Sequence, residues 1–540
     1  MKPNRTWKSL CRWMALFLFL SALASCGGAS QKETMNVKTD SMLRPEAQDA
    51  VLEERKESGL DKNKDERDMN TEEYAPIKEN EFKSALQEPL STFSIDVDKA
   101  SYSNVRRFLL DNQLPPKDAV RIEEMVNYFT YDYPQPTGDT PFSFSTEISG
   151  CPWNKKHKLV HIGIQGKKLD YENLKASNLV FLIDVSGSMD DPNKLPLLQK
   201  SMKMLVENLS SKDRVAIVTY AGEAGLVLPS TSASEKETIC RALDNLHAGG
   251  STAGGEGIEL AYKVAKENLI KGGNNRVILA TDGDFNVGIS STGDLVKMIE
   301  EKRKDDIYLT ICGFGMGNYK DSRMEDISDA GNGNYFYIDN IQEAQKVFVT
   351  EMRANMFTIA KDVKIQVEFN PAKVGEYRLI GYEDRVMSSR DFEDDKKDAG
   401  ELGAGHTVTA LYEIIPAGSD EVKNMPLKYQ QTKVNDNGRE WLTLKFRYKP
   451  IYSDQSILIE KPVEDNGTSF SDAPENLRFA SAVASFGMLL RDSKYKGDFR
   501  YEDVLMIAKN ASVFDKEGYR SEFIKLVETA SLLSKNETGK

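Results

Sequence analysis

The clearest pattern in the chain is a series of short apolar runs separated by amphipathic stretches, between about residues 173 and 355. Two predicted strands, Leu179–Ile183 and Arg276–Ala280, are almost continuously apolar, as in strands buried on both faces of a parallel sheet. Strands that alternate with helices predict an α/β fold with a doubly wound, mostly parallel, Rossmann-like sheet and right-handed crossovers. The first predicted helix has apolar residues on one face, at Leu195, Leu198, Met202, Leu205 and Leu209.

A period of two replaces this pattern on both sides of the region. Strict alternation in Val363–Phe369, Val408–Ile414 and Leu442–Tyr448 predicts an antiparallel β-sandwich. Residues 142–148 and 159–165 alternate in the same way. We hypothesise that these earlier strands join the later ones, so that the α/β domain is inserted between strands of one β-domain.

Helical periodicity returns at both ends of the folded part. Near the C-terminus, for example, Phe479, Val483, Phe486 and Leu490 share one face. The predicted order is a leader at 1–25, a tether at 26–85, a helical segment at 86–135, β-strands at 136–172, the α/β domain at 173–355, the β-sandwich at 356–465 and a helical segment at 466–540.

The first residues are typical of a targeting segment. Basic residues precede the apolar stretch Trp13–Leu20, which is shorter than the roughly 20 residues that cross a bilayer. Leu23–Cys26 resembles a bacterial lipobox, which implies cleavage before Cys26 and lipid attachment to it; the alternative is an ordinary signal peptide with an incidental cysteine. Gly27 follows where an inner-membrane retention signal would have Asp, and Ser30–Glu33 resembles a surface-export signal. We therefore expect a lipid-anchored envelope protein at the outer membrane.

Composition limits the classes of partner. Residues 27–85 are charged and poor in aromatic residues, which predicts a flexible tether. The net charge of −13 and the pI near 5.2 argue against nucleic acid. Apart from Cys11 in the leader and Cys26, the cysteines are Cys151, Cys240 and Cys312, of which the last two are expected to be buried. Their spacing matches no zinc motif, and it does not reveal any disulfide pairing.

Small oxygen side chains follow the predicted central strands. Asp184, Ser186 and Ser188 come directly after one strand, and Asp282 comes after another. The loop that contains Thr252 opens a helix between them. Functional groups of parallel sheets gather beyond the carboxyl ends of the strands, and hard divalent cations prefer oxygen ligands.

This ordered set resembles the metal-ion-dependent adhesion site of von Willebrand factor type A domains. The resemblance implies a Mg²⁺ ion, or Mn²⁺ or Ca²⁺ in its place, held directly or through water by Asp184, Ser186, Ser188, Thr252 and Asp282. It also implies that a protein ligand supplies a carboxylate to the open position of the ion, and that the protein is not an enzyme. The alternative is a degenerate domain in which the motif is a polar turn. Residues 398–413 and 482–495 further resemble YfbK-type bacterial lipoproteins.

Two other functions remain open at this point. One is a structural or assembly scaffold in which the metal only orders loops. The other is a metal-dependent hydrolase, although no G-x-S-x-G motif surrounds Ser186 or Ser188. The histidines are His157, His161, His247 and His406, and only His247 is expected near the site. The pattern does not identify the ligand or the oligomeric state.

Three further motifs receive structural interpretations. Asp96-Val97-Asp98 resembles the start of a haloacid dehalogenase phosphotransfer site, but Ala100 replaces the expected Thr, so a helix cap by Asp98 is favoured. Asp191-Pro192 is interpreted as an N-cap and a first-turn proline. The acidic segment Asp391–Asp398 is interpreted as a solvated loop rather than a calcium site, because its spacing is irregular.

Overall fold

The computed structural model describes residues 72–95, 98–170, 174–250, 254–283, 292–316, 320–423, 428, 434 and 438–538. The predicted leader, Cys26 and the tether up to residue 71 lie outside the described residues. Asp68–Lys540 form one compact unit, and its described strands make up three sheets.

The α/β domain contains one of these sheets. Its strands are β5 (Ser177–Asp184), β6 (Arg214–Tyr220), β7 (Ala224–Ser232), β8 (Asn274–Thr281), β9 (Ile307–Phe314) and β10 (Tyr335–Ile338). They lie in the order β10–β9–β8–β5–β6–β7, and all neighbours are parallel except β7, which is antiparallel to β6. This is the mostly parallel sheet that the sequence predicted.

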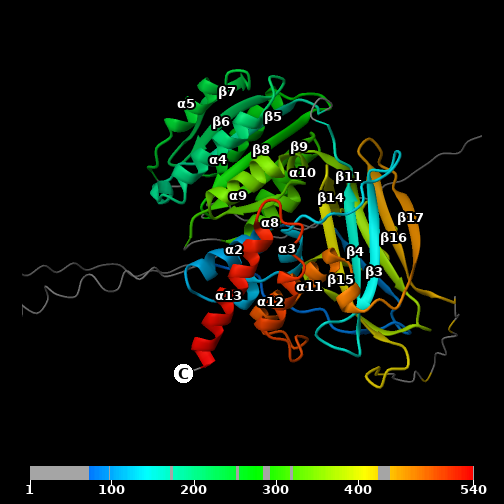
Figure 1. Cartoon of the computed structure of the whole chain (residues 1–540). Coiled ribbons are helices and arrows are strands. Elements are labelled where there is room, and N and C mark those ends of the chain that lie inside the picture. Colours follow the sequence, from blue (N-terminus) through cyan, green and yellow to red (C-terminus); the bar gives the residue numbers. More distant parts are fainter. Residues whose placement is uncertain are drawn as a thin grey trace, which may run out of the picture. The chain divides into compact units, whose positions relative to one another are not determined.

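Helices cover both faces of this sheet (Figure 1). They are α4 (Leu195–Asn208), α5 (Lys236–Asp244), α6 (Gly254–Glu267), α7 (Thr292–Arg303), α8 (Asp321–Ala330), α9 (Ile341–Gln345) with a π turn (Lys346–Thr350), and α10 (Met352–Met356). Phe181 and Ile183 of β5 face the core beneath α4, α5 and α9, whereas Leu182 faces the core beneath α6, α7 and α8. Burial of successive residues on opposite faces explains why the run is continuously apolar.

Two antiparallel sheets form the β-sandwich. The first consists of β1 (Lys83–Ser84), β12 (Val374–Ile380), β15 (Thr407–Pro416), β4 (Lys158–Gly166) and β3 (Phe142–Gly150), in that order. The second consists of β13 (Val386–Met387), β2 (Leu90–Ser94), β11 (Thr358–Phe369), β16 (Glu440–Pro450) and β17 (Ile457–Glu464), and β14 (Gly400–Gly403) pairs with β11. Phe93, Ile162 and Val367 belong to their shared apolar core.

The α/β domain is an insertion in this sandwich. β4 precedes the domain in the chain and pairs with β15, which follows it. β3 extends the same sheet by pairing with β4. Strands from the two sides of the insertion therefore complete a single β-domain, as the alternation on both sides predicted.

Two parts of the N-terminal region differ from the sequence interpretation. The segment 86–135, predicted to be helical, begins with strand β2, whose Phe93 pairs with Ile365 of β11. Phe93 and Ile95 point into the sandwich, a period-two pattern too short to stand out beside the helix that follows. The last part of the expected tether, residues 72–85, packs on the fold, because β1 pairs with β12 and Ala85 is buried.

Helices from the two ends of the folded chain pack together (Figure 1). They are α2 (Ala100–Leu110), α3 (Ile122–Asn127), α11 (Glu475–Arg491), α12 (Tyr501–Lys509) and α13 (Tyr519–Thr538). The Phe129 ring meets the rings of Phe479 and Phe523 edge-on, at centroid distances of 4.9 and 5.7 Å. Gly487 lets α11 approach α3 closely, since an added Cβ would lie 2.8 Å from Ile122 Cγ1.

Candidate functional site

The carboxyl ends of β5 and β8 lie side by side. The two strands are parallel neighbours, with Ile183 opposite Ala280. Asp184 ends β5 and Thr281 ends β8, and Thr281 Oγ1 donates a hydrogen bond to Asp184 Oδ2 at 3.4 Å. Asp282 follows Thr281 directly. The topology therefore brings Asp184 and Asp282 to the same edge of the sheet.

The loop after β5 surrounds a buried carboxylate. Asp184 is fully buried, and its Oδ1 accepts a hydrogen bond from the Ser186 backbone N–H at 2.9 Å. Burial raises the pKa of Asp184, hydrogen bonds from Ser186 oppose this shift, and the nearby Asp282 carboxylate adds to it. Ser186 Oγ lies 3.0 Å from Ser188 Oγ, and Ser188 is exposed. The site therefore combines a buried carboxylate, from Asp184, with a residue that is exposed to solvent, Ser188.

The loop expected to carry Thr252 is joined to the loop after β5. The Gly249 N–H donates to the Val185 carbonyl at 2.8 Å, and the Gly187 N–H donates to the Gly250 carbonyl at 3.2 Å. Thr252 itself lies outside the described residues. The structure thus brings together four of the five predicted ligands, Asp184, Ser186, Ser188 and Asp282, with the described start of the Thr252 loop beside them.

The third loop contributes Asp282, which is 3% exposed. Its Oδ2 accepts a hydrogen bond from Lys194 Nζ at 3.0 Å, and the same ammonium donates to the Ser188 carbonyl at 2.9 Å. Asp282 Oδ1 is buried and has no hydrogen-bond partner among the described residues. A buried carboxylate oxygen without a partner is costly, and coordination of a cation would relieve that cost.

The side chains gathered at this site are of the chemical type that binds a hard divalent cation. They offer two carboxylates and two hydroxyls, which are the oxygen donors that Mg²⁺ and Ca²⁺ prefer. The part of the chain that the structure describes holds no cluster of three or more His, Cys, Asp or Glu side chains arranged for a metal. A site built from Asp184, Ser186, Ser188 and Asp282 has only two such residues and relies on hydroxyls and water.

Sequence reasoning missed Lys194 and placed the start of the next helix too early. Asp191-Pro192 is not a cap, because α4 begins at Leu195 with Lys194 at its N-cap and Pro196 in its first turn. The residues before it form a 3₁₀ turn, Gly187–Asp190, that displaces the helix start. One feature of the sequence could have pointed to Lys194. It is a lysine near a predicted helix N-terminus, where the macrodipole favours acidic residues.

The histidines belong mostly to the β-sandwich. His157 contacts Glu413 through Nδ1 at 2.5 Å and Glu421 through Nε2 at 2.7 Å. His161 Nε2 shares a hydrogen bond with the Tyr133 hydroxyl at 2.8 Å. Burial lowers the pKa of His161 to about 4 and that of His406 to about 3. His247 is exposed on the segment that precedes Gly249.

Asp98 has a different role from the one predicted. Asp98 does not cap α2, whose N-cap is Lys99; it accepts a hydrogen bond from the Tyr335 N–H at 3.0 Å and pairs with Arg385 at 3.3 Å. The first contact joins the start of α2 to the inserted domain, and the second joins it to the sandwich. Asp96 and Val97 lie outside the described residues.

The acidic segment Asp391–Asp398 is largely exposed, as the prediction of a solvated loop requires, and lysines hold its backbone. The buried Lys364 ammonium donates to the carbonyls of Asp391 and Asp394 at 3.0 and 2.6 Å. Lys449 donates to the Asp395 carbonyl at 2.6 Å. These bonds fix the backbone of the loop and leave Glu393 and Asp394 exposed.

The three described cysteines are free thiols. Cys151 and Cys312 are buried, and burial raises the pKa of both thiols above the usual range. Cys240, which was also expected to be buried, is only partly covered. A raised pKa keeps the thiols protonated, which lowers their reactivity.

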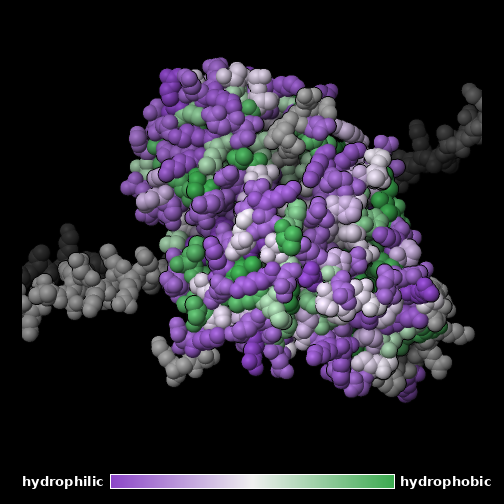
Figure 2. Space-filling view, in the orientation of Figure 1, coloured by the Kyte–Doolittle hydropathy of each residue, from purple (hydrophilic) through white to green (hydrophobic). Residues whose placement is uncertain are grey.

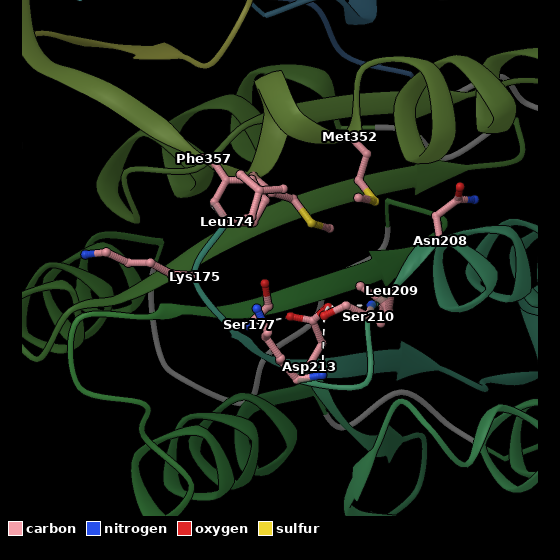
Figure 3. A pocket seen from close by; sticks show the side chains of 11 residues that line it. Leu174, Lys175, Ser177, Asn208, Leu209, Ser210, Asp213, Met352 and Phe357 are labelled. Carbon is pink, nitrogen blue, oxygen red and sulfur yellow. Dashed lines mark hydrogen bonds between the residues drawn. The ribbon is translucent and has the colours of Figure 1, made fainter. Parts of the chain in front are cut away.

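A small cavity of about 60 Å³ lies at the opposite end of β5 and β6 (Figure 3). Leu174 and Phe357, from the two connections between the inserted domain and the sandwich, both line it. Asp213 Oδ1 accepts a hydrogen bond from the Ser177 N–H there at 2.7 Å. Because Ser177 starts β5 and Asp184 ends it, the cavity is roughly 23 Å from the candidate metal site.

Hydrophilic residues cover most of the face shown in Figure 2, and its hydrophobic residues form small separate groups. This face therefore lacks the broad apolar patch that marks many permanent interfaces. Within the described ranges, no helix combines the length and the apolar character needed to cross a bilayer.

Comparison with known proteins finds three family models along the chain, and one of them covers most of the inserted α/β domain. Models described as von Willebrand factor, von Willebrand factor type A domain, and uncharacterized protein YfbK, C-terminal, match residues 68–161, 178–350 and 354–533. Uncharacterized protein YfbK from Escherichia coli strain K12 is 45% identical over 471 residues, which cover 85% of this chain and 81% of that protein. The chain belongs to the YfbK family of von Willebrand factor type A proteins.

More distant similarities cover smaller or less closely matched parts. Uncharacterized protein sll0103 from Synechocystis is 27% identical over 37% of this chain and 46% of its own length. A solved von Willebrand factor type A protein from Catenulispora acidiphila is 16% identical, covers 71% of this chain and 89% of its own, and has a TM-score of 0.40. The family membership and the fold class predicted from the sequence are confirmed, and a type A domain indicates a protein-binding or scaffold role.

Proposed function

We propose that this protein binds a protein ligand through a divalent cation held beyond the ends of β5 and β8. The observation that carries the proposal is the convergence of Asp184, Ser186, Ser188 and Asp282, together with the unpartnered Oδ1 of Asp282 among the described residues. Burying two carboxylates, one of them with an oxygen that has no hydrogen-bond partner, destabilises the fold if the residues serve only a structural role. A cation would satisfy that oxygen.

Mg²⁺ is the ion that suits these donors best, with Mn²⁺ or Ca²⁺ as alternatives. Ser186 and Ser188 would offer hydroxyl oxygens, Asp184 and Asp282 would supply negative charge, and Thr252 is assigned to the same set by the resemblance. The bound ion would supply an electrophilic centre that is incompletely coordinated by the protein. Because Ser188 is exposed, a carboxylate of another protein can reach this side of the site.

We propose that the protein is located in the bacterial cell envelope and is anchored to the outer membrane. Its support is the lipobox-like Leu23–Cys26, which would place a lipid on Cys26. One acyl-modified cysteine and a charged tether would hold the folded unit near the membrane surface. Substitution Cys26→Ser should release the protein into the soluble fraction of an envelope preparation.

Enzymatic function is not favoured. Ser186 and Ser188 hydrogen-bond each other, and within the described residues neither contacts an imidazole that could act as a general base. A hydrolase that used Ser186 or Ser188 as its nucleophile would therefore need a general base other than these imidazoles. The scaffold alternative, in which the cation only orders the three loops, is separated from ligand binding by experiment.

The test is capture of ligand from envelope extracts by the purified protein, with Mg²⁺ and with EDTA. Binding should require Mg²⁺ and should be lost in Asp184→Ala. The matched control is Asp190→Ala, which removes an exposed carboxylate from the same loop and should leave binding intact. Binding that survives both EDTA and Asp184→Ala would contradict the proposed function, and Mg²⁺-dependent stability without Mg²⁺-dependent binding would favour the scaffold.

A further inference from the structure

Lys194 connects two loops of the candidate metal site. Its Nζ donates to the Ser188 carbonyl, in the loop after β5, at 2.9 Å. It also donates to Asp282 Oδ2, in the loop after β8, at 3.0 Å, and it lies 3.9 Å from Asp191 Oδ2. An ammonium group of the chain itself is therefore in direct contact with the residues that would hold the cation.

The surrounding fold fixes the position of this lysine. Gly315, directly after β9, has a φ of +78°, and a Cβ there would lie 2.3 Å from Lys194 Cε and 2.6 Å from Lys194 Cγ. The Tyr337 hydroxyl donates to the Gly315 carbonyl at 2.5 Å, which holds that turn in place. Lys194 is only 8% exposed. A side chain at position 315 would therefore displace the stem of Lys194, so this close packing requires glycine there.

Lys194 stands at a place in its helix that is electrostatically unfavourable. It is the N-cap residue of α4, and the first turn of that helix contains no acidic residue. The positive end of the helix macrodipole repels an ammonium group there. The ion pair with Asp282 offsets this repulsion, so the metal-site loops, and not helix capping, account for the lysine.

The lysine also changes the formal charge of the site. Among the buried charged groups, Asp184, Asp282 and Lys194 together give a charge of −1, which a divalent cation changes to +1. Asp191 is not counted, because its side chain is 68% exposed and its charge is screened by water. Without Lys194 the two carboxylates give −2, and the loaded site would be neutral. A residual positive charge in a partly buried site attracts anions and repels further cations at short range.

We propose that Lys194 weakens cation binding at this site and, in exchange, keeps the loaded site positive, so that it selects anionic over neutral ligands. This inference deepens the proposed function and rests on the cation site described above. Lys194 acts as a positioning and charge-setting residue, in contact with Asp282 rather than with the ion.

The test compares Lys194→Met and Lys194→Gln, which remove the charge, with Lys194→Arg, which keeps it, all in the full chain. Isothermal titration with Mn²⁺ alone should give a dissociation constant about tenfold lower for both neutral variants than for wild type, and near the wild-type value for Lys194→Arg. At saturating Mn²⁺, a hexaglutamate peptide should bind the neutral variants about fivefold more weakly than wild type. A hexaglutamine peptide should show no such difference.

Circular dichroism establishes that each variant is folded, and Lys194→Gln, which keeps part of the stem and a hydrogen-bond donor, serves if Lys194→Met does not fold. Unchanged Mn²⁺ binding in the folded neutral variants would overturn the inference while leaving the cation site intact. Weaker Mn²⁺ binding would also overturn it, and would identify Lys194 as a clamp that the cation needs. If wild type itself does not bind Mn²⁺, the proposed function fails, and the inference fails with it.

Discussion

Arg106 and Asp339 form a buried, two-pronged ion pair, with Nε–Oδ2 and Nη2–Oδ1 distances of 2.8 and 2.5 Å. Arg106 lies on α2, and Asp339 follows β10 of the inserted domain. The same guanidinium contacts Glu343 of α9 at 2.7 Å and Glu522 of α13 at 3.1 Å. One side chain therefore ties the inserted domain to helices from both ends of the folded chain.

Substitution Arg106→Met should strongly destabilise the protein. It would leave Asp339 and Glu343 buried without their cation, and breaking a buried pair from one side costs about 3–5 kcal/mol. Equilibrium urea denaturation, followed by circular dichroism, measures the free energy of unfolding of wild type and variant.

The control for this substitution is Lys535→Met. It removes an exposed ion pair between Lys535 and Glu502, whose N–O distance is 2.8 Å. Exposed pairs are screened by water and contribute little, so no measurable change in stability is expected. Equal stability of Arg106→Met and Lys535→Met would show that the buried pair does not hold the domains together.

Metal should stabilise the wild-type fold, and Asp184→Ala should abolish this effect. A cation that binds only the folded state adds about 2.7 kcal/mol to the free energy of unfolding at 100 times its dissociation constant. Differential scanning fluorimetry with Mg²⁺ and then with EDTA measures the shift in Tm. Asp190→Ala should keep the wild-type shift, whereas a full shift in Asp184→Ala would argue against Asp184 as part of the cation site.

His157 should make the free energy of unfolding depend on pH above the unfolded-state pKa of histidine. Burial lowers the pKa of His157, but its hydrogen bonds and charge interactions with Glu413 and Glu421 outweigh this and raise the pKa above its usual 6.5. A raised folded-state pKa gives a stabilising contribution that is complete below the unfolded-state pKa, about 6.5. This contribution is lost as the pH rises through the folded-state pKa.

The comparison is urea denaturation of wild type and His157→Gln from pH 6 to pH 9. Gln cannot become charged, so the variant should be less stable at pH 6, and the difference should shrink as the pH rises. A difference that stays constant over this range would mean that protonation of His157 does not contribute.

Local patterns predicted the strands that build the inserted domain. Leu179–Ile183 and Val277–Ala280 are apolar because each strand is buried on both faces, and this signal depends on neighbouring residues only. Helical crossover connections between the strands allow their parallel pairing, and parallel pairing brings Asp184 and Asp282 to one edge of the sheet. Alternation likewise predicted β4 and β15, although not their register.

Long-range contacts account for what the sequence did not predict. β2 has five residues and is specified by its pairing with β11, far along the chain. Residues 72–85 have the composition of a tether. They nevertheless pack on the sandwich, because β1 pairs with the edge strand β12. Lys194 looks like an ordinary helix residue until the fold places Asp282 and Gly315 beside it.

The most direct test of the cation site is an anomalous difference map from crystals soaked in Mn²⁺. The account predicts a peak bounded by Asp184, Ser186, Ser188 and Asp282, with oxygen neighbours at about 2.2 Å, as expected for an octahedral ion of this size. Soaked crystals in which these residues keep their positions but no peak lies among them would contradict it.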